Sequence, residues 1–225
     1  MKRWELLDTA NIPRDGGELR LLRRDNEFAI RISGTTGDLM NSRTHGSEDA
    51  LGALACARCS NSDSAKVLIG GLGMGFTLAA ALDVLPGDAR VVVAELVPGV
   101  AKWNREVLGM CAGDPLSDDR VEVTISDVGD VINRASNEYD AILLDVDNGP
   151  EGLTHPGNDD LYTLLGLQSA YRALRKSGVL AVWSVSSAPR FTKLLKRAGF
   201  TVEEQRVRAH KGKGARHVIW LASRK

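Results

Sequence analysis

A glycine cluster after a short apolar run is the part of the sequence best suited to hold a ligand. Residues 67–69 are β-rich and apolar, and a helical run follows at residues 77–82. Glycine accepts positive φ angles and lets a ligand approach the main chain where a Cβ atom would collide. A strand, a glycine turn and a helix predict a nucleotide site at the carboxyl end of the strand. The glycines are Gly70, Gly71, Gly73 and Gly75.

Three carboxylates follow the next predicted strands and could serve such a nucleotide. Glu95 comes roughly 20 residues after the glycines, where a carboxylate accepts hydrogen bonds from both ribose hydroxyls. Asp127 could accept a hydrogen bond from an adenine amino group or cap the following helix. Asp145 ends the fourth strand, where an open α/β sheet has its crevice. We also assign Met74, Leu96 and Val128, their neighbours, to the nucleotide site.

Asp145 also begins an acidic, turn-rich connection that continues to Asn158. A connection of this length is either a lid over the reacting centre or a plain surface loop. Asp145 is the candidate for orienting or deprotonating an acceptor, and Asp147 and His155 are held in reserve for that role.

Strands and helices alternate from residue 67 to the C-terminus, where residues 200–222 form a hairpin. Two of the expected helices cover residues 98–108 and 160–175. This order predicts an α/β, doubly wound, Rossmann-like fold with a mostly parallel sheet. Residues 1–44 are expected to form a β-rich segment with a hairpin or meander, and residues 45–225 the catalytic domain. Because a small sheet cannot bury both faces alone, it should pack on the main domain or on a second copy. We therefore expect a homodimer.

The overall composition narrows the choice of partners. Lys plus Arg and Asp plus Glu both number 29 in 225 residues, so net charge favours neither nucleic acid nor an anionic membrane. No apolar run approaches the ~20 residues of a membrane span. The three cysteines are sparse, as in a reducing cytoplasm, where we expect the protein to reside. Cys56 and Cys59 lack the second pair of a structural zinc site, so no metal is predicted.

These residues together resemble the spermidine synthase-like branch of the S-adenosylmethionine-dependent methyltransferase superfamily, which has the class I methyltransferase fold. The resemblance covers the helix entry at residues 45–48, the glycine turn and the three carboxylates. It implies that the glycine turn contacts the amino-acid portion of a sulfonium nucleotide. It also implies that Glu95 binds the ribose, Asp127 the adenine and Asp145 the incoming amine.

The sequence departs from the aminopropyltransferases of that family at three positions. Their G-G-G-D-G-G motif has an Asp where this chain has Met74, and the second acid of D-x-x-D-P is here Asn148 or is displaced to Asp147. The Gln that the family has after the fifth strand corresponds to Trp183. Each ammonium of a polyamine needs a polar partner once desolvated. The nucleotide half of the site is therefore retained, and the polyamine half is not.

These observations favour a methyltransferase that uses S-adenosylmethionine and an unidentified small-molecule acceptor. The alternative is an aminopropyltransferase of the spermidine synthase type, which uses decarboxylated S-adenosylmethionine and a diamine. A third hypothesis is a nucleotide-binding oligomeric protein without catalysis. Relative affinities for S-adenosylmethionine, its decarboxylated form and methylthioadenosine would separate the three.

Overall fold

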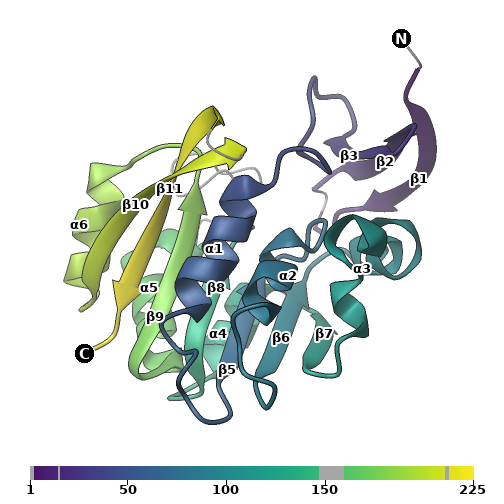
Figure 1. The fold of residues 1–225 in the computed structure, drawn as a ribbon. Coiled ribbons are helices and arrows are strands. Elements are labelled where there is room, and N and C mark those ends of the chain that lie inside the picture. Colours follow the sequence, from purple (N-terminus) through teal and green to yellow (C-terminus); the bar gives the residue numbers. More distant parts are fainter. Residues whose placement is uncertain (1–2, 15, 147–159, 211–212) are drawn as a thin grey trace.

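Two β-sheets organise the chain, one small and antiparallel and one large and mostly parallel (Figure 1). The fold is that of a computed structural model, which describes residues 3–14, 16–146, 160–210 and 213–225. The strands of the small sheet, in order, are β1 (Glu5–Asn11), β2 (Glu18–Arg24), β3 (Glu27–Ile32) and β4 (Met40–Asn41). The strands of the large sheet are β5 (Lys66–Gly70), β6 (Arg90–Glu95), β7 (Val121–Ile125), β8 (Tyr139–Leu144), β9 (Leu174–Ser184), β10 (Thr201–His210) and β11 (Lys213–Ser223).

The large sheet has the strand order β10-β11-β9-β8-β5-β6-β7, which reverses direction between β5 and β8. The strands from β9 to β7 are parallel, whereas β11 is antiparallel to β9 and forms a hairpin with β10. The predicted doubly wound fold with an antiparallel C-terminal hairpin is therefore confirmed. Ligands of such sheets bind beyond the carboxyl ends of the strands where the order reverses. For this chain, that place is the end of β5 and β8.

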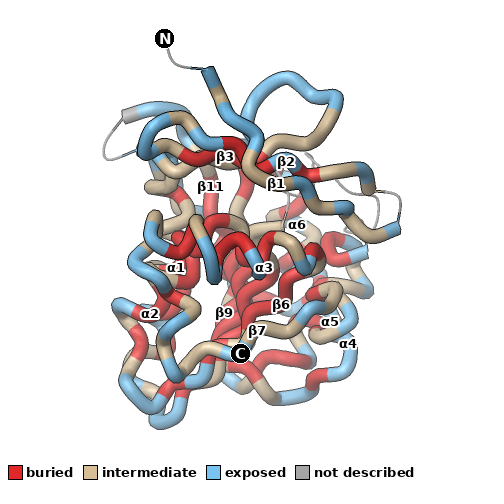
Figure 2. The backbone as a smooth tube through the Cα atoms, turned by 90° about the vertical axis from the view of Figure 1, so that its right-hand side faces the viewer, coloured by how far each residue is buried: buried red, intermediate tan, exposed pale blue. Residues whose placement is uncertain are grey.

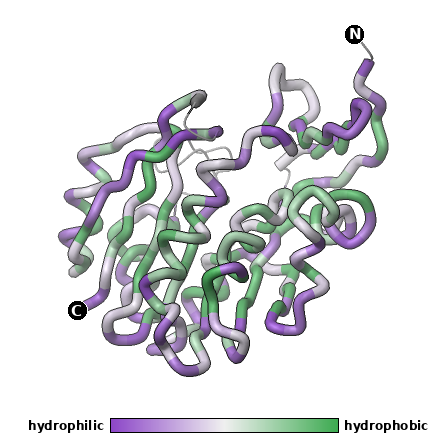
Figure 3. Tube along the Cα trace, in the orientation of Figure 1, coloured by the Kyte–Doolittle hydropathy of each residue, from purple (hydrophilic) through white to green (hydrophobic). Residues whose placement is uncertain are grey.

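Helices cover both faces of the large sheet, because successive side chains of a buried strand point to opposite faces. Val67 and Ile69 of β5 pack with α1, α2 and α3, whereas Leu68 packs with α4, α5 and α6. Buried residues gather in the central strands (Figure 2), and these strands are also the most hydrophobic part of the chain (Figure 3). The helices are α1 (Gly46–Cys56), α2 (Phe76–Leu82), α3 (Pro98–Trp103), α4 (Val128–Arg134), α5 (Leu164–Ala173) and α6 (Pro189–Arg197).

The small sheet packs on the main domain and shares its hydrophobic core. Leu21 and Ile30 are almost completely buried and belong to the same cluster as the helices of the nearer face. Asp8 of β1 accepts hydrogen bonds from the Trp103 indole at 2.9 Å and from Lys102 at 3.0 Å, which anchors the sheet on α3. Packing on the main domain was one of the two arrangements expected. Self-association and the division at residues 44 and 45 stay predictions.

Two helices differ from the sequence-based expectation. The helix predicted for residues 98–108 is α-helical only to Trp103 and continues as a π-helix, η1 (Asn104–Leu108). The helix predicted for residues 160–175 begins at Leu164 and ends at Ala173, and β9 follows at once. The early start of β9 allows Leu174 to pair with Tyr139 of β8, a tertiary contact that local sequence does not reveal. In the part of the chain that is described, no helix is long and apolar enough to cross a lipid bilayer.

Candidate active site

Two adjoining cavities lie at the carboxyl ends of β5 and β8. The first, the roof cavity, has the small sheet as its roof, with Ile12, Ile30 and Ile32 opposite Gly71, Glu95 and Asp127. The second, the acidic cavity, is lined by Glu48, Met74, Phe76, Thr77 and Trp183. Both cavities are lined by Met40, Gly73 and Asp145. Molecules bound in the two cavities would therefore meet at Asp145.

The glycine turn places the main chain against the end of β8. Gly71 has a φ of 84°, and a Cβ atom on it would lie 2.8 Å from the carbonyl oxygen of Asp145. Asn104, at the start of the π-helix, donates a hydrogen bond of 2.8 Å to the carbonyl of Gly73 and so fixes the turn from behind. Within the described residues, Gly70 and Gly75 line neither cavity, and Gly75 is the N-cap of α2. The close approach at Gly71 explains why this position lacks a side chain.

Glu95 lies on the floor of the roof cavity at the end of β6. Its carboxylate is almost fully buried and accepts backbone hydrogen bonds from Leu72 and Val97, each of 2.8 Å. Burial raises the pKa of Glu95, and the backbone donors oppose this effect. The amides of Leu96 and Gly73 also contribute backbone hydrogen bonds to Glu95, so ribose hydroxyls would share this carboxylate with the main chain. Leu96 and Val128 line the same cavity, as expected for a nucleotide site.

Asp127 lines the roof cavity but already has partners on both carboxylate oxygens. Oδ1 accepts a hydrogen bond of 2.8 Å from Gly129 and thereby caps α4, the alternative role considered for this residue. Oδ2 pairs with Arg14 at 2.9 Å, and the Arg14 side chain is 56% exposed. An adenine amino group at Asp127 would share the carboxylate with Arg14. Arg14 could not be predicted as a partner of Asp127, because it comes from the distant loop between β1 and β2.

Asp145 and Glu48 are half-buried carboxylates that both line the acidic cavity. Asp145 accepts a hydrogen bond of 2.9 Å from the Thr77 hydroxyl, and Glu48 accepts one of 2.6 Å from Ser47. Burial raises the pKa of Asp145 to about 7, with a further contribution from the charge of Glu48. Burial also raises the pKa of Glu48. No Lys or Arg in the described ranges forms an ion pair with either acid; for Glu48, the charge of His45 opposes the effect of burial on the pKa.

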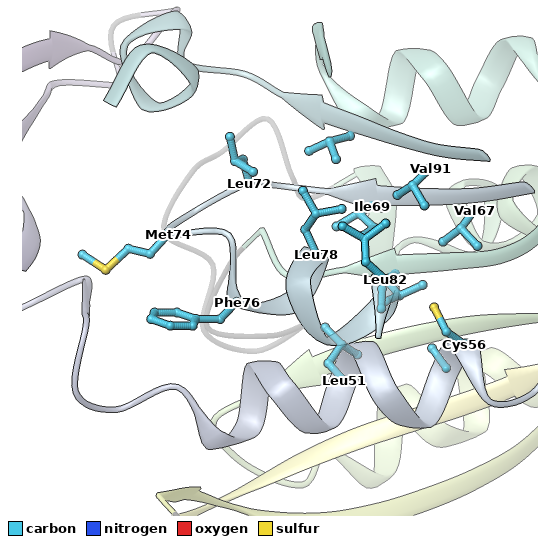
Figure 4. Close-up of a cluster of buried hydrophobic side chains, with 14 of the residues drawn as sticks. Leu51, Cys56, Val67, Ile69, Leu72, Met74, Phe76, Leu78, Leu82 and Val91 are labelled. Atoms are coloured by element: carbon cyan, nitrogen blue, oxygen red, sulfur yellow. The ribbon is translucent and has the colours of Figure 1, made fainter. Parts of the chain in front are cut away.

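Met74 and Phe76 provide an apolar wall of the acidic cavity. Both project in the same direction from the glycine turn and the start of α2 (Figure 4), and Met74 is 3% exposed. Trp183 of β9 lines the same cavity. Met74 and Trp183 therefore lie on the side of Asp145 that faces away from the roof cavity. At both positions the sequence differs from the aminopropyltransferase motifs described above. Asp147 and His155, the two reserve candidates, lie outside the described residues.

Glu48, Ser47 and Thr77 were not among the residues proposed from sequence. Glu48 follows the helix entry at His45, but nothing in its spacing indicates that it meets Asp145. The closeness of Glu48 and Asp145 depends on close packing of α1 on α2. Gly52 permits this packing, because a Cβ atom at this position would lie only 2.4 Å from the Thr77 carbonyl oxygen. An acid in the first turn of a helix is ordinarily explained by the helix dipole, so the sequence contained no distinct signal.

Comparison with known proteins agrees with this arrangement. A spermidine synthase crystallised with the transition-state analogue AdoDATO superposes with a TM-score of 0.73 and 17% identity, over 98% of this chain and 72% of its own. Spermidine synthase from Thermotoga maritima superposes with a TM-score of 0.73 and 16% identity, again over 98% of this chain and 72% of its own. No curated protein matches in sequence. The family described as the spermine/spermidine synthase domain matches residues 54–217, which include the glycine turn, Glu95, Asp127 and Asp145. The chain therefore belongs to the spermine/spermidine synthase domain family.

Proposed function

We propose that this protein transfers an aminopropyl group from decarboxylated S-adenosylmethionine to an aliphatic amine. This was the alternative hypothesis from sequence, and membership of the spermine/spermidine synthase family supports it over methyl transfer. The observation that carries the proposal is the pair of half-buried acids, Asp145 and Glu48, in a cavity adjoining the roof cavity.

The acidic cavity suits an amine with an aliphatic body. Two half-buried carboxylates without an ion-paired Lys or Arg are costly, because desolvation penalises charge that is not paired. An ammonium group supplies that partner and forms charge-assisted hydrogen bonds with both acids. The apolar side chains around the acids accommodate methylene groups. They are Met40, Leu72, Met74, Phe76 and Trp183.

The roof cavity suits the adenosyl half of the donor. Glu95 and Asp127 lie where the ribose and the adenine would bind, and the glycine turn lies between them and Asp145. Binding both substrates on either side of Asp145 would bring the amine into line with the carbon on the sulfonium, and orientation of this kind supplies much of the rate enhancement.

The reaction requires one deprotonation and one displacement. An ammonium group first loses a proton to Asp145, whose pKa of about 7 suits a general base at neutral pH. The free amine then forms a bond to the carbon next to sulfur. The carbon–sulfur bond breaks with its electron pair remaining on sulfur, which releases methylthioadenosine.

Methyl transfer from S-adenosylmethionine is the second candidate, and Met74 is the observation that favours it. The resemblance implies an acid at this position for the donor amine, whereas Met74 is buried and apolar. Without an acid at position 74, the carboxylate of the complete donor meets no repulsion from this side chain.

Mass spectrometry of the products separates the two candidates. The protein is incubated with an aliphatic diamine or monoamine and with either donor. We expect the amine to gain one aminopropyl group and methylthioadenosine to be released. Asp145→Asn should abolish transfer, whereas Asp63→Asn, at an exposed position far from the cavities, is the matched control. Methylated amine from the complete donor, with no aminopropyl product from the other, would replace the proposal with the second candidate.

A further inference from the structure

A chain of hydrogen bonds leads from the acidic cavity to the opposite side of α1. Glu48 and Ser47 are joined by a hydrogen bond of 2.6 Å between Oε2 and Oγ. The same Ser47 Oγ lies 2.9 Å from Nδ1 of His217, which is on β11. Ser47 is completely buried, so water does not compete for its hydroxyl. The three side chains therefore form a continuous path through the packed interface between α1 and the C-terminal hairpin.

The hydrogen bonds of the path can run in either direction, because a serine hydroxyl both donates and accepts a hydrogen bond. When Glu48 is ionised, His217 Nδ1 donates to Ser47 and Ser47 donates to Glu48. When Glu48 is protonated, it donates to Ser47, and Ser47 donates to His217 Nδ1. Both arrangements satisfy every group, which is the property required of a proton-conducting chain.

The far end of the path reaches a third cavity, which is separate from the roof cavity and the acidic cavity. His217 lines an outer cavity between the small sheet and the β10–β11 hairpin, opposite Trp4 and Arg43. Among the described residues its Nε2 has no hydrogen-bond partner, so this nitrogen can exchange a proton with water. Burial lowers the pKa of His217, which keeps the ring neutral and able to accept a proton at neutral pH.

Among the described residues that line the outer cavity, the acids are paired with arginines, so no unpaired carboxylate would hold a proton on His217. Around the outer cavity, Glu27 is paired with Arg24 at 2.7 Å and with Arg43 at 3.0 Å. Asp38 is paired with Arg31 at 2.8 Å. On β9, the Trp183 ring meets the His217 ring edge to face with centroids 4.8 Å apart. The remaining titratable group that lines the cavity is His210 of β10.

We propose that Glu48, Ser47 and His217 conduct the proton lost by the acceptor amine from the acidic cavity to the outer cavity. This rests on the proposed function, because an alkylated amine is what releases the proton. The proton passes from the amine to the Asp145–Glu48 pair, and Glu48 gives one proton to Ser47 Oγ. Ser47 gives its own to His217 Nδ1, and Nε2 releases one to water. The ring regains its starting tautomer by turning Nδ1 towards water, where Nδ1 loses its proton and Nε2 gains one, and then turning back; no electrons are transferred.

In this scheme His217 is a positioning residue that acts through Ser47, and His217→Asn tests it. The amide of Asn can keep the hydrogen bond to Ser47 but cannot conduct a proton. We expect kcat to fall at least about tenfold, with donor affinity unchanged, and to become dependent on buffer concentration. Added imidazole should restore activity. His210→Asn, in the same cavity on the other strand, is the matched control and should match the wild type.

A wild-type kcat and pH profile for His217→Asn would overturn the proposal, as would a loss that imidazole does not restore. A second measurement does not depend on turnover. Nuclear magnetic resonance should show the His217 ring responding to titration of Glu48 in the wild type, and Ser47→Ala should remove that response. The absence of any response in the wild type would overturn the path. A response in a protein that transfers nothing would instead contradict the proposed function alone.

Discussion

The desolvated Asp145 carboxylate should make the stability of the protein fall as pH rises. Its pKa is about 7 in the fold, against 3.8 for a free aspartate, chiefly because burial disfavours the charged form. The folded state therefore keeps its proton to higher pH than the unfolded chain does. This contribution to stability is complete below about pH 4 and is lost progressively as pH rises to about 7.

The size of the effect follows from the same two values. They differ by about three pH units, and each unit corresponds to about 1.4 kcal/mol, so the full loss is about 4 kcal/mol. Between about pH 5 and about pH 8, wild type should lose about 3 kcal/mol through this group. Asp145→Asn removes the charge, keeps the size and can still accept the Thr77 hydrogen bond. The variant should therefore lack this part of the pH dependence.

Urea unfolding of wild type and Asp145→Asn at several pH values measures the difference. The free energy of unfolding of the variant, relative to wild type, should increase by about 3 kcal/mol from about pH 5 to about pH 8. Asp63→Asn should leave the wild-type pH dependence unchanged. If Asp145→Asn and wild type lose stability in parallel as pH rises, then Asp145 does not titrate as a buried acid, and the reasoning about its environment is wrong.

Three further substitutions test the donor side of the site. Glu95→Ala should weaken binding of the adenosyl donor by ~1–3 kcal/mol, which is the cost of losing hydrogen bonds to a charged acceptor. Unchanged donor affinity in a titration would show that Glu95 does not bind the donor. Met74→Asp should shift donor preference toward the decarboxylated form by ~1–2 kcal/mol, and an equal effect on both donors would show that position 74 does not face the donor amine. Arg14→Ala should change stability by less than about 1 kcal/mol, because Arg14 is largely exposed. The same variant should bind the donor more tightly, since Asp127 is then free for adenine; weaker binding would indicate that Arg14 itself contacts the donor.

Much of the fold could be predicted because its strands are short apolar runs that end in glycines or acids. Parallel strands bring their carboxyl ends to one edge of the sheet, so Glu95, Asp127 and Asp145 could be placed together before any coordinates. Strand β1 could not be predicted, since its residues have no regular alternation of buried and exposed positions. The π-helix that begins at Asn104 could not be predicted either, because local sequence does not distinguish it from a continued α-helix.

The acceptor half of the site was less accessible from sequence. The interpretation of Met74 as the loss of an acid stays a prediction, and it concerns that position alone. The compensating acid, Glu48, lies on a different element and reaches Asp145 only because α1 packs closely on α2 at Gly52. The path from Ser47 to His217 joins α1 to the last strand, and no local pattern predicts such a contact. The site therefore has to be judged from the side chains that tertiary packing brings together.

Calorimetric titration of an aliphatic amine into protein saturated with methylthioadenosine tests the central claim most directly. The claim is that Asp145 and Glu48 hold the acceptor amine beside the adenosyl site. Wild type should bind the amine with a change in bound protons, because the ammonium displaces protons from the acid pair. The double variant Glu48→Gln, Asp145→Asn should bind no amine while keeping its affinity for methylthioadenosine. Equal amine binding by wild type and the double variant would contradict the account.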